Sequence, residues 1–154
     1  MPQLEPSYWL MKSEPDAYSI DTLKNDGVTI WDGIRNYQAR NFMRKMNIGD
    51  KVFFYHSNCK PPGIVGLMEV IDLKIVDPTQ FDKDSKYFDS KSKPDNPRWD
   101  CVKVKYISKS TRILSLPELK NLFSEDELLV VKKGNRLSIL PGQNDIAKIL
   151  LEKI

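Results

Sequence analysis

The chain has 154 residues, 40% of them hydrophobic and 29% charged, a composition that suits one globular domain over residues 1–154 and excludes an intrinsically disordered chain. The formal net charge is +3, from 24 basic and 21 acidic residues, which permits nucleic-acid binding without requiring it. No apolar run reaches the roughly 18 residues of a membrane-spanning helix, and the N-terminal residues lack the features of a signal peptide, so we expect a protein that is neither membrane-bound nor secreted.

The cysteine and histidine content argues against a metal centre. Cys59 and Cys101 are far apart and form no CxxC pair, and His56 is the single histidine. A zinc site with ordinary ligand spacing cannot be assembled from this set, and two isolated cysteines in a chain without a signal peptide indicate free thiols. Glycine-rich nucleotide-binding motifs are also absent from the sequence. We therefore expect no metal and no cofactor, and a cytoplasmic protein in a bacterium or a nuclear one in a eukaryote.

The N-terminal elements are predicted to alternate between strand and helix. Residues 8–12 (YWLMK) are typical of a strand. A short helix follows, with Ser19 as its N-cap and Gly27 at its end. Residues 28–31 (VTIW) are again strand-like.

A second helix is predicted from Asn36, its N-cap, to about Met46. Within it, Ala39, Phe42, Met43 and Met46 recur at the i, i+3, i+4, i+7 spacing of a buried helical face. The polar and basic residues of this segment then lie off the core.

The centre of the chain predicts two strands followed by a long loop. Residues 51–57 (KVFFYHS) form an apolar run of strand length, which favours burial on both faces. Residues 64–76 predict a long or bent strand with a bulge at Gly66. Residues 77–97 are polar and rich in proline, and a loop of this length in a compact domain is usually functional or mobile.

The next segment predicts a strand and two helix starts. Residues 99–108 alternate between apolar and lysine positions, as in a strand with one wet face. Ser115 and Glu118 have the spacing of a capping box, and Ser124 with Glu127 repeats that helix-start signal.

The chain closes with a short strand at 136–140 and an amphipathic helix at 142–154. The predicted apolar face of this helix comprises Ile146, Ile149, Leu150 and Ile154. Together these elements predict an α+β domain of about five or six strands curled into a partly open barrel, with helices packed outside.

One stretch, WDGIRNYQARN at 31–41, combines an aromatic residue with many planar hydrogen-bonding side chains. Trp31 closes a strand, and Arg35 and Asn36 begin a helix, whose N-terminal N–H groups and positive dipole favour an anion such as a phosphate. A flat heterocycle could stack on the tryptophan while amides read its edge. The structural alternative is a core tryptophan, solvated arginines and an asparagine that only caps.

Further polar and aromatic residues fall at predicted strand ends, where side chains project from a barrel rim. They are Ser13, Tyr55, His56, Ser57, Trp99, Arg136 and Ser138. His56 can be a catalytic base or a structural hydrogen-bonding group, and a regular strand would direct Tyr55 and Ser57 to the face opposite to it. No acidic pair or nucleophile motif accompanies it, so the sequence favours a binding protein over an enzyme.

Several long motifs resemble the EVE domain family, in order and over nearly the whole chain. The motifs are YWLMKSEPD (8–16), WDGIRNYQARNF (31–42), GDKVFFYHSNCKPPGIVGLMEV (49–70), DNPRWDCVKV (95–104) and RLSI (136–139). The resemblance implies a PUA-like fold, a small curved barrel flanked by helices and related to the YTH domains that read methylated adenine in RNA. It also implies binding of nucleic acid that carries a modified base, with modified cytosine in DNA the suspected target.

Carried over by motif, the resemblance implies one pocket at the barrel mouth. Its base-binding residues would be Ser13, Trp31, Arg35, Asn36, Gln38, Asn41, Tyr55, His56, Ser57, Trp99, Arg136 and Ser138. Arg35, Arg40 and Arg136 are the expected phosphate contacts.

The predicted function is therefore a non-enzymatic reader of a modified base in DNA or RNA, taken into the pocket by base flipping. We expect a monomer whose partner is nucleic acid. Two alternatives stay open from the sequence. One is a nucleotide-processing enzyme with His56 as general base, and the other is a sensor of a small nucleotide-like ligand.

Overall fold

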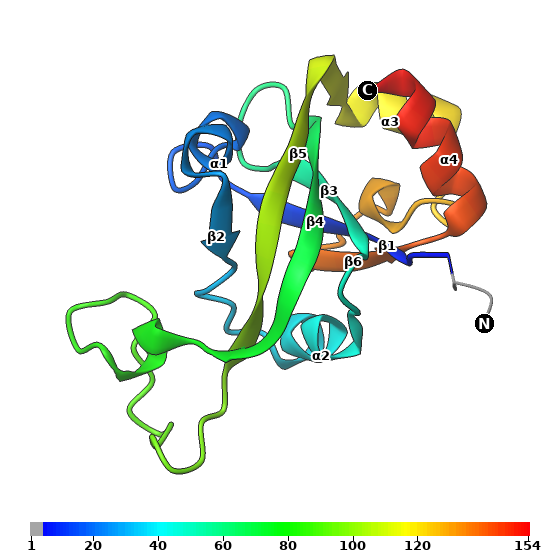
Figure 1. Ribbon diagram of the computed structural model, residues 1–154. Helices are drawn as coiled ribbons and strands as arrows, with labels where there is room; N and C mark the ends of the chain where they lie inside the picture. The colour runs from blue at the N-terminus through cyan, green and yellow to red at the C-terminus, as the bar shows by residue number, and fades with distance from the viewer. Residues whose placement is uncertain (1–4) are drawn as a thin grey trace.

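The computed structural model describes residues 5–154, which form one six-stranded sheet with four α-helices around it (Figure 1). The strands are β1 (Tyr8–Ser13), β2 (Val28–Ile30), β3 (Lys51–His56), β4 (Gly63–Val76), β5 (Asp100–Ser115) and β6 (Ile139–Gly142). The helices are α1 (Ile20–Asp26), α2 (Tyr37–Lys45), α3 (Leu116–Leu122) and α4 (Asn144–Lys153), with short 3₁₀ helices η1 (Pro78–Phe81) and η2 (Leu129–Val131). None of the helices in residues 5–154 is long and apolar enough to cross a membrane.

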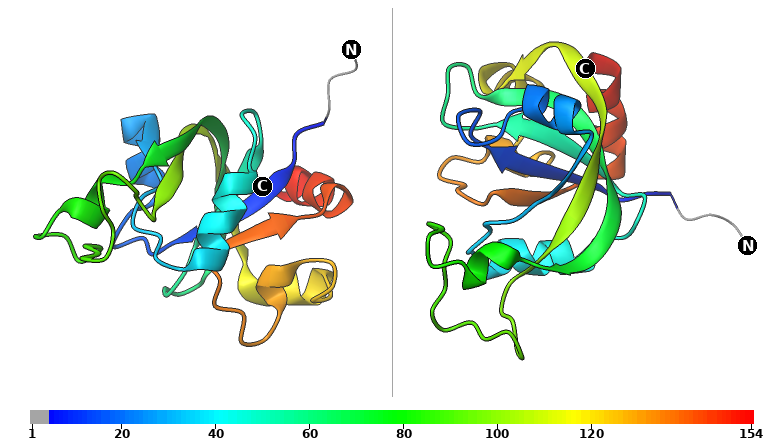
Figure 2. Two further views of the ribbon diagram at one scale, coloured as in Figure 1. Left: turned by 90° about the horizontal axis from the view of Figure 1, so that it is seen from below. Right: turned by 60° about the vertical axis from the view of Figure 1, so that its left-hand side comes forward.

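The strand order is β2-β5-β4-β3-β1-β6, and only the β1–β3 pair is parallel. The two long strands β4 and β5 form a bent ribbon that curls over the shorter strands (Figures 1 and 2). Their pairing shifts register at several points, one of them next to Gly66, where the sequence predicts a bulge. Such bulges increase local twist and bend. The edge strands β2 and β6 do not pair, so the predicted curved and partly open barrel is confirmed.

The sheet buries a hydrophobic cluster on each face, and β3 contributes to both. Phe54 belongs to the cluster that contains Trp31 and the buried side of α2, whereas Phe53 and Tyr55 belong to the cluster under α3 and α4. Alternate residues of a strand point to opposite faces, so this division follows from the regular pleat. The predicted two-sided burial of the 51–57 strand is confirmed.

Cap residues determine where α1 and α2 begin and where α1 ends. These are the two helices nearest the cleft described below. The Ser19 side chain accepts a hydrogen bond from the Thr22 N–H, and α1 ends at Gly27, which has a φ of 79°. The Asn36 side chain accepts from the Ala39 N–H and starts α2. Both predicted caps are confirmed, because an N-cap depends on contacts within one turn of the chain.

Four sequence predictions in the C-terminal half need correction. The strand predicted at 99–108 continues to Ser115, because β4 is long enough to pair with it throughout. The side chains of Ser124 and Glu127 do form a reciprocal capping box, but only a turn and η2 follow. The chain turns back here instead of extending a helix, since Leu128 and Val130 are drawn into the core.

The last strand begins at Ile139, three residues later than predicted. Asn135 holds the preceding segment in a turn by donating to the Leu129 carbonyl and accepting from the Leu137 N–H. In α4, Ile149 is 40% exposed, although it is predicted to lie on the apolar face of the helix. Ala147 is buried instead and belongs to the core cluster under α3 and α4.

A buried carboxylate joins β1 to the turn before β3. Asp50 is 3% exposed and accepts hydrogen bonds from the Ser7 N–H, the Trp9 Nε1–H and the Asn47 N–H. A buried charge is tolerated only where hydrogen bonds replace its hydration. Asp50 therefore fixes the start of β1 against the turn that leads into β3.

We predict that Asp50→Ala lowers the free energy of unfolding by about 2–4 kcal/mol, because the change leaves the buried Trp9 Nε1–H and two partly buried N–H groups without their acceptor. Chemical denaturation measures the change. Asp72→Ala is the matched control, because Asp72 is exposed and its carboxylate accepts only from the neighbouring Leu73 N–H. Equal stability of the two variants would contradict a structural role for Asp50.

Candidate functional site

A cleft of about 530 Å³ opens between the end of β1, the segment after β2 and the 77–98 loop. Its size falls within the usual range for small-ligand sites, about 300–1,000 Å³. In Figure 1 these segments lie on the side of the molecule that carries β2 and the long green loop. The lining residues are Lys12, Ser13, Glu14, Ala17, Tyr18, Thr29, Ile30, Trp31, Asp32, Gly33, Ile34, Lys86 and Tyr87.

Trp31 lines the cleft and also belongs to the core. Trp31 is 7% exposed. The centroid of its ring lies 5.4 Å from that of Phe54 and 6.4 Å from that of Tyr18, and both contacts are edge-to-face. The Tyr18 hydroxyl donates to the Asp26 carboxylate, which fixes its ring. Trp31 is therefore a core residue, as the structural alternative expects, and it also lines the cleft. Stacking of a base on its ring stays a prediction.

Gly33 lets the long loop approach the segment after β2. Its φ is +80°, and a Cβ atom at this position would lie 2.8 Å from the Tyr87 Cε2 atom. Any side chain would collide with the tyrosine ring, and most would also strain the backbone. Because Gly33 has no side chain, the Tyr87 ring can lie against it and form part of the cleft wall.

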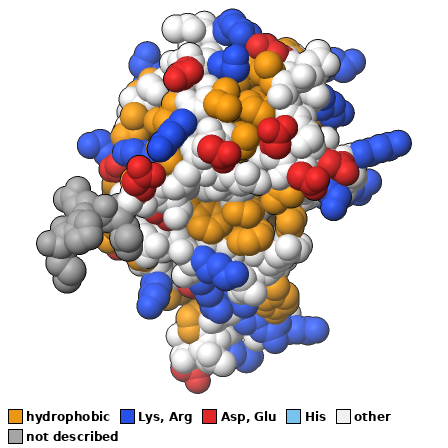
Figure 3. Space-filling view, turned by 90° about the vertical axis from the view of Figure 1, so that its right-hand side faces the viewer, with side chains coloured by type: hydrophobic (Ala, Val, Ile, Leu, Met, Phe, Trp, Pro, Cys, Tyr) orange, Lys and Arg blue, Asp and Glu red, His pale blue; other side chains and the backbone are white. Residues whose placement is uncertain are grey.

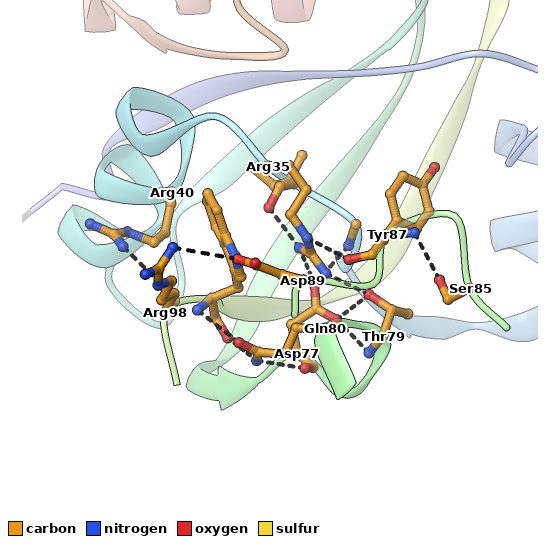
Figure 4. A network of polar contacts seen from close by, with 12 residues as sticks. Arg35, Arg40, Asp77, Thr79, Gln80, Ser85, Tyr87, Asp89 and Arg98 are labelled. Atoms are coloured by element: carbon orange, nitrogen blue, oxygen red, sulfur yellow. Dashed lines mark hydrogen bonds and ion pairs between the residues drawn. The ribbon is translucent and has the colours of Figure 1, made fainter. Parts of the chain in front are cut away.

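The carboxylate of Asp77, 1% exposed, joins the two loops that border the cleft (Figure 4). It accepts hydrogen bonds from the Gly33 N–H at 2.8 Å, from Arg35 Nη1 at 3.0 Å, and from the Thr79 N–H and hydroxyl. Burial alone would raise the pKa of Asp77, but the hydrogen bonds from Thr79, Gly33 and Arg35 outweigh it and hold the pKa below its usual value. The side chain is therefore ionised at neutral pH.

Arg35 completes this connection rather than facing solvent. Its Nε–H donates to the Tyr87 carbonyl, Nη1 to the Ile34 carbonyl and to Asp77, and Nη2 to the Thr79 hydroxyl. Four of the five N–H groups of the guanidinium are thereby used within the protein. A phosphate contact by Arg35 stays a prediction, with one N–H group left to make it.

Trp99 lies behind this network, at the base of the long loop. It is 5% exposed, stacks on Tyr37 at 4.8 Å, and donates its Nε1–H to the Asp89 carboxylate. The guanidinium carbons of Arg35 and Arg40 lie 5.2 and 5.7 Å from its ring centroid. Trp99 thus supports the exposed Tyr37 and the arginines around it.

The loop itself is ordered by the side chain of Gln80, which is fully buried. Its amide nitrogen donates to the Asp77 and Trp99 carbonyls, and its amide oxygen accepts from the Ser92 hydroxyl and the Trp99 N–H. These hydrogen bonds join the beginning of the loop to its end, so the loop is ordered although it is long.

Basic side chains gather on α2 beside the cleft. This helix carries Arg40, Arg44 and Lys45, with an acidic residue at none of its positions. Arg40 lies 4.6 Å above the half-exposed Tyr37 ring and donates to the Arg98 carbonyl, and Arg44 pairs with Asp100. Figure 3, which views the side of the molecule opposite to β2, shows Lys and Arg side chains in its upper part and in its lower part, the latter at the height where Figure 1 places α2 and the long loop.

The structure brings together only part of the predicted pocket. Ser13 and Trp31 line the cleft, and Arg35 and Trp99 support its outer wall. Asn36 is occupied as the cap of α2. Gln38 and Asn41 are exposed on that helix, where Asn41 accepts hydrogen bonds from Arg40.

The remaining predicted residues lie elsewhere. Tyr55 is buried in the cluster on the other face of the sheet, as the strand alternation predicts. Ser57 pairs through its N–H with the Ser13 carbonyl. Arg136 is exposed on an irregular segment, and Ser138 joins β1 through its carbonyl.

His56 is a structural hydrogen-bond acceptor in this fold. Its Nε2 atom accepts from the Ile20 N–H at the start of α1, and its ring meets Phe54 edge-to-face. Partial burial lowers the pKa of His56, which favours the neutral ring that this hydrogen bond requires.

Sequence reasoning missed Tyr18, Asp32 and Tyr87 as cleft residues. Asp32 stands within the polar 31–41 stretch, where the amides and arginines give the stronger signal of a binding site. Tyr87 lies in the 77–97 loop, whose length indicates function without indicating which side chain carries it. No pattern among the sequence neighbours of Tyr18 indicates that it lines the cleft, since the ring that it contacts, Trp31, is thirteen positions away.

We predict that Asp77→Asn lowers the free energy of unfolding at pH 7 by about 1–3 kcal/mol, because one charged acceptor of several hydrogen bonds is lost. The pKa of Asp77 is depressed in the folded state, so its contribution is complete above the unfolded pKa of about 4 and is lost as the pH falls through the lower folded value. The stability difference between wild type and variant should therefore be constant from pH 7 to about 5 and shrink below about 4. A constant difference down to pH 2 would contradict this assignment.

Comparison with known proteins gives the family. The EVE domain family matches residues 7–153. Human thymocyte nuclear protein 1 is 43% identical, covering 88% of this chain and 68% of that protein, and its zebrafish counterpart is 48% identical, covering 79% and 58%. The chain thus spans between 58% and 68% of the length of these two relatives.

Solved structures agree with this result. A crystal structure of a Pseudomonas syringae protein is 42% identical with a TM-score of 0.89, covering 96% of this chain and 99% of that one. A crystal structure of human THYN1 protein in complex with 5-methylcytosine containing DNA is 40% identical with a TM-score of 0.88, covering 95% and 96%. The resemblance that the sequence motifs indicate is confirmed, and the chain belongs to the EVE domain family.

Proposed function

We propose that this protein is a non-enzymatic DNA-binding reader that takes a modified base, 5-methylcytosine in the first instance, into the cleft beside Trp31. The observation that carries the proposal is a cleft lined by three aromatic residues, Tyr18, Trp31 and Tyr87, in a chain 40% identical to a protein solved with DNA containing 5-methylcytosine. Aromatic faces and edges suit a flat, methylated heterocycle.

The dimensions of the cleft fit a base that has left the helix. A volume of about 530 Å³ holds a pyrimidine and part of its sugar, but not a stacked duplex. Extruding a base from a duplex costs a few kcal/mol, roughly, and contacts in the cleft must offset this cost. A single strand avoids the cost, so affinity for single-stranded DNA should be at least as high.

The surroundings of the cleft supply phosphate contacts. Lys86 lies at its rim, and the basic side chains of α2 lie next to the wall that Arg35 and Tyr87 form. Cations that contact phosphates release counterions when DNA binds, so affinity should fall as salt rises. A sensor of a small nucleotide-like ligand would show little such dependence.

The position of His56 argues against a nucleotide-processing enzyme. A general base needs a free lone pair within reach of the proton that it removes. The Nε2 lone pair of His56 is taken up by the Ile20 N–H, and His56 is not among the residues that line the cleft. The proposal is therefore a reader rather than a catalyst.

We predict that Tyr87→Ala weakens binding of a single-stranded oligonucleotide with one 5-methylcytosine roughly 5- to 100-fold, because base–aromatic stacking contributes about 1–3 kcal/mol. Fluorescence anisotropy measures affinity. The backbone carbonyl that Arg35 uses is retained in the variant. Phe88→Ala is the control, because Phe88 is the next loop residue, is 38% exposed and is not among the cleft residues. Equal affinities of the two variants would place the base outside this cleft.

Trp31→Ala is not a clean test of stacking, because Trp31 belongs to the core and truncating a buried tryptophan costs about 3–5 kcal/mol. A loss of binding in this variant would therefore not separate stacking from unfolding, and Tyr87 is the position that tests stacking.

We predict that His56→Gln retains most of the affinity, because glutamine keeps a planar acceptor for the Ile20 N–H and removes the titratable group. Oligonucleotide recovered from the wild-type protein should be chemically unchanged when analysed by mass spectrometry. Recovery of a converted base, with conversion abolished in His56→Gln, would replace the reader by an enzyme.

A further inference from the structure

The carboxylate of Asp32 lies at the cleft without a partner. Trp31 extends the pairing of β2 with β5 by donating its N–H to the Val102 carbonyl, and its ring is buried. Asp32, the next residue, is exposed and lines the cleft. Within residues 5–154, no other residue donates a hydrogen bond to the Asp32 side chain or forms an ion pair with it, and only its own backbone N–H acts on the carboxylate. It is therefore a free acceptor beside the aromatic surface.

Lys12 and Lys86 also line the cleft, but Arg35 is the cation whose charge lowers the pKa of Asp32, and it is already committed. Arg35 pairs with Asp77, which itself receives its full set of donors, so neither group neutralises Asp32. Loss of hydration to the surrounding protein and the negative charge of Asp77 raise the pKa of Asp32, and a hydrogen bond from its own backbone and the charge of Arg35 offset this only in part. A ligand that enters the cleft displaces water from this exposed carboxylate, so a donor on the ligand must replace the lost hydrogen bonds.

The chemistry of an ionised carboxylate selects among bases. It only accepts hydrogen bonds, so it matches the exocyclic amino group of cytosine, which donates through N4. Thymine presents a carbonyl oxygen at the same place, and two acceptors facing each other repel. Thymine and 5-methylcytosine share the 5-methyl group and the ring, so an aromatic surface alone distinguishes them poorly.

We propose that Asp32 accepts a hydrogen bond from the N4 amino group of a cytosine base bound in the cleft, and that it thereby rejects thymine, the deamination product of 5-methylcytosine. The inference rests on the proposed function and adds to it the group that reads the edge of the base. Trp31, Tyr18 and Tyr87 supply surface, whereas Asp32 supplies the distinction between an amino group and a carbonyl.

The test uses single-stranded oligonucleotides of one sequence that carry 5-methylcytosine, cytosine or thymine at a central position. We expect the wild-type protein to bind the 5-methylcytosine strand about 5- to 100-fold more tightly than the thymine strand, the range that one good base-edge contact provides. In Asp32→Asn the amide can donate to the thymine carbonyl, so this ratio should fall to below about 3-fold through weaker binding of 5-methylcytosine, stronger binding of thymine, or both. Asp32→Ala should lose affinity for 5-methylcytosine without gaining it for thymine.

Asp84→Asn is the matched control, because it makes the same change of charge on an exposed residue of the long loop outside the cleft lining. It should keep the wild-type ratio. Thermal melting of each variant checks the fold, and the exposed position of Asp32 predicts little change.

The outcomes separate the two proposals. A wild-type protein that binds the 5-methylcytosine strand no more tightly than the cytosine strand contradicts the proposed function. A wild-type protein that prefers 5-methylcytosine to cytosine but binds thymine equally well contradicts only the role of Asp32. A wild-type protein with the expected preference, together with Asp32→Asn and Asp32→Ala variants that keep it, contradicts only the role of Asp32. Equal weakening of all strands in both variants would likewise overturn edge reading, since it would reflect a general electrostatic effect.

Discussion

The buried carboxylate of Asp77 is the contact on which the geometry of the cleft depends. A charge that is 1% exposed must be surrounded by donors, and here they come from Gly33, Arg35 and Thr79. Gly33 and Arg35 belong to the segment after β2, and Thr79 belongs to the long loop, so satisfying one charge fixes two distant segments against each other. The approach of Tyr87 to Gly33 follows from this arrangement.

A cleft wall built in this way is rigid in the absence of a ligand. Arg35, Gln80 and Trp99 each use most of their polar groups inside the protein, so they orient the wall and need not move when a ligand enters. Such preorganisation reduces the entropy that binding must offset. Many polar residues near the cleft are structural for the same reason: side chains of the 31–41 stretch form hydrogen bonds with backbone groups of the two loops and of α2.

The sequence predicts those features that depend on neighbouring residues. The caps Ser19 and Asn36 and the alternation in β3 are local, and all three are confirmed. The contacts of Asp77 with Gly33 and Arg35 join residues 44 and 42 positions apart, and no local pattern encodes them. Ser124 and Glu127 show that a local signal can form without the element that it predicts. Their capping box forms, but the following residues pack into the core and do not continue as a helix. The EVE family resemblance supplied the long-range arrangement that periodicity could not.

The cleft and the neighbouring helix differ in charge. The cleft lining holds both signs, Glu14 and Asp32 with Lys12 and Lys86, whereas the charged residues of α2 are all basic. In the proposed reader, the basic helix attracts a phosphate backbone whatever its sequence, whereas the cleft admits one base and tests its hydrogen-bonding edge. If acceptor and cation shared one position they would neutralise each other, as Arg35 and Asp77 do, and neither would be available to DNA. Affinity and specificity can thus be adjusted by different residues, because Arg35 and Tyr87 form a fixed wall between them.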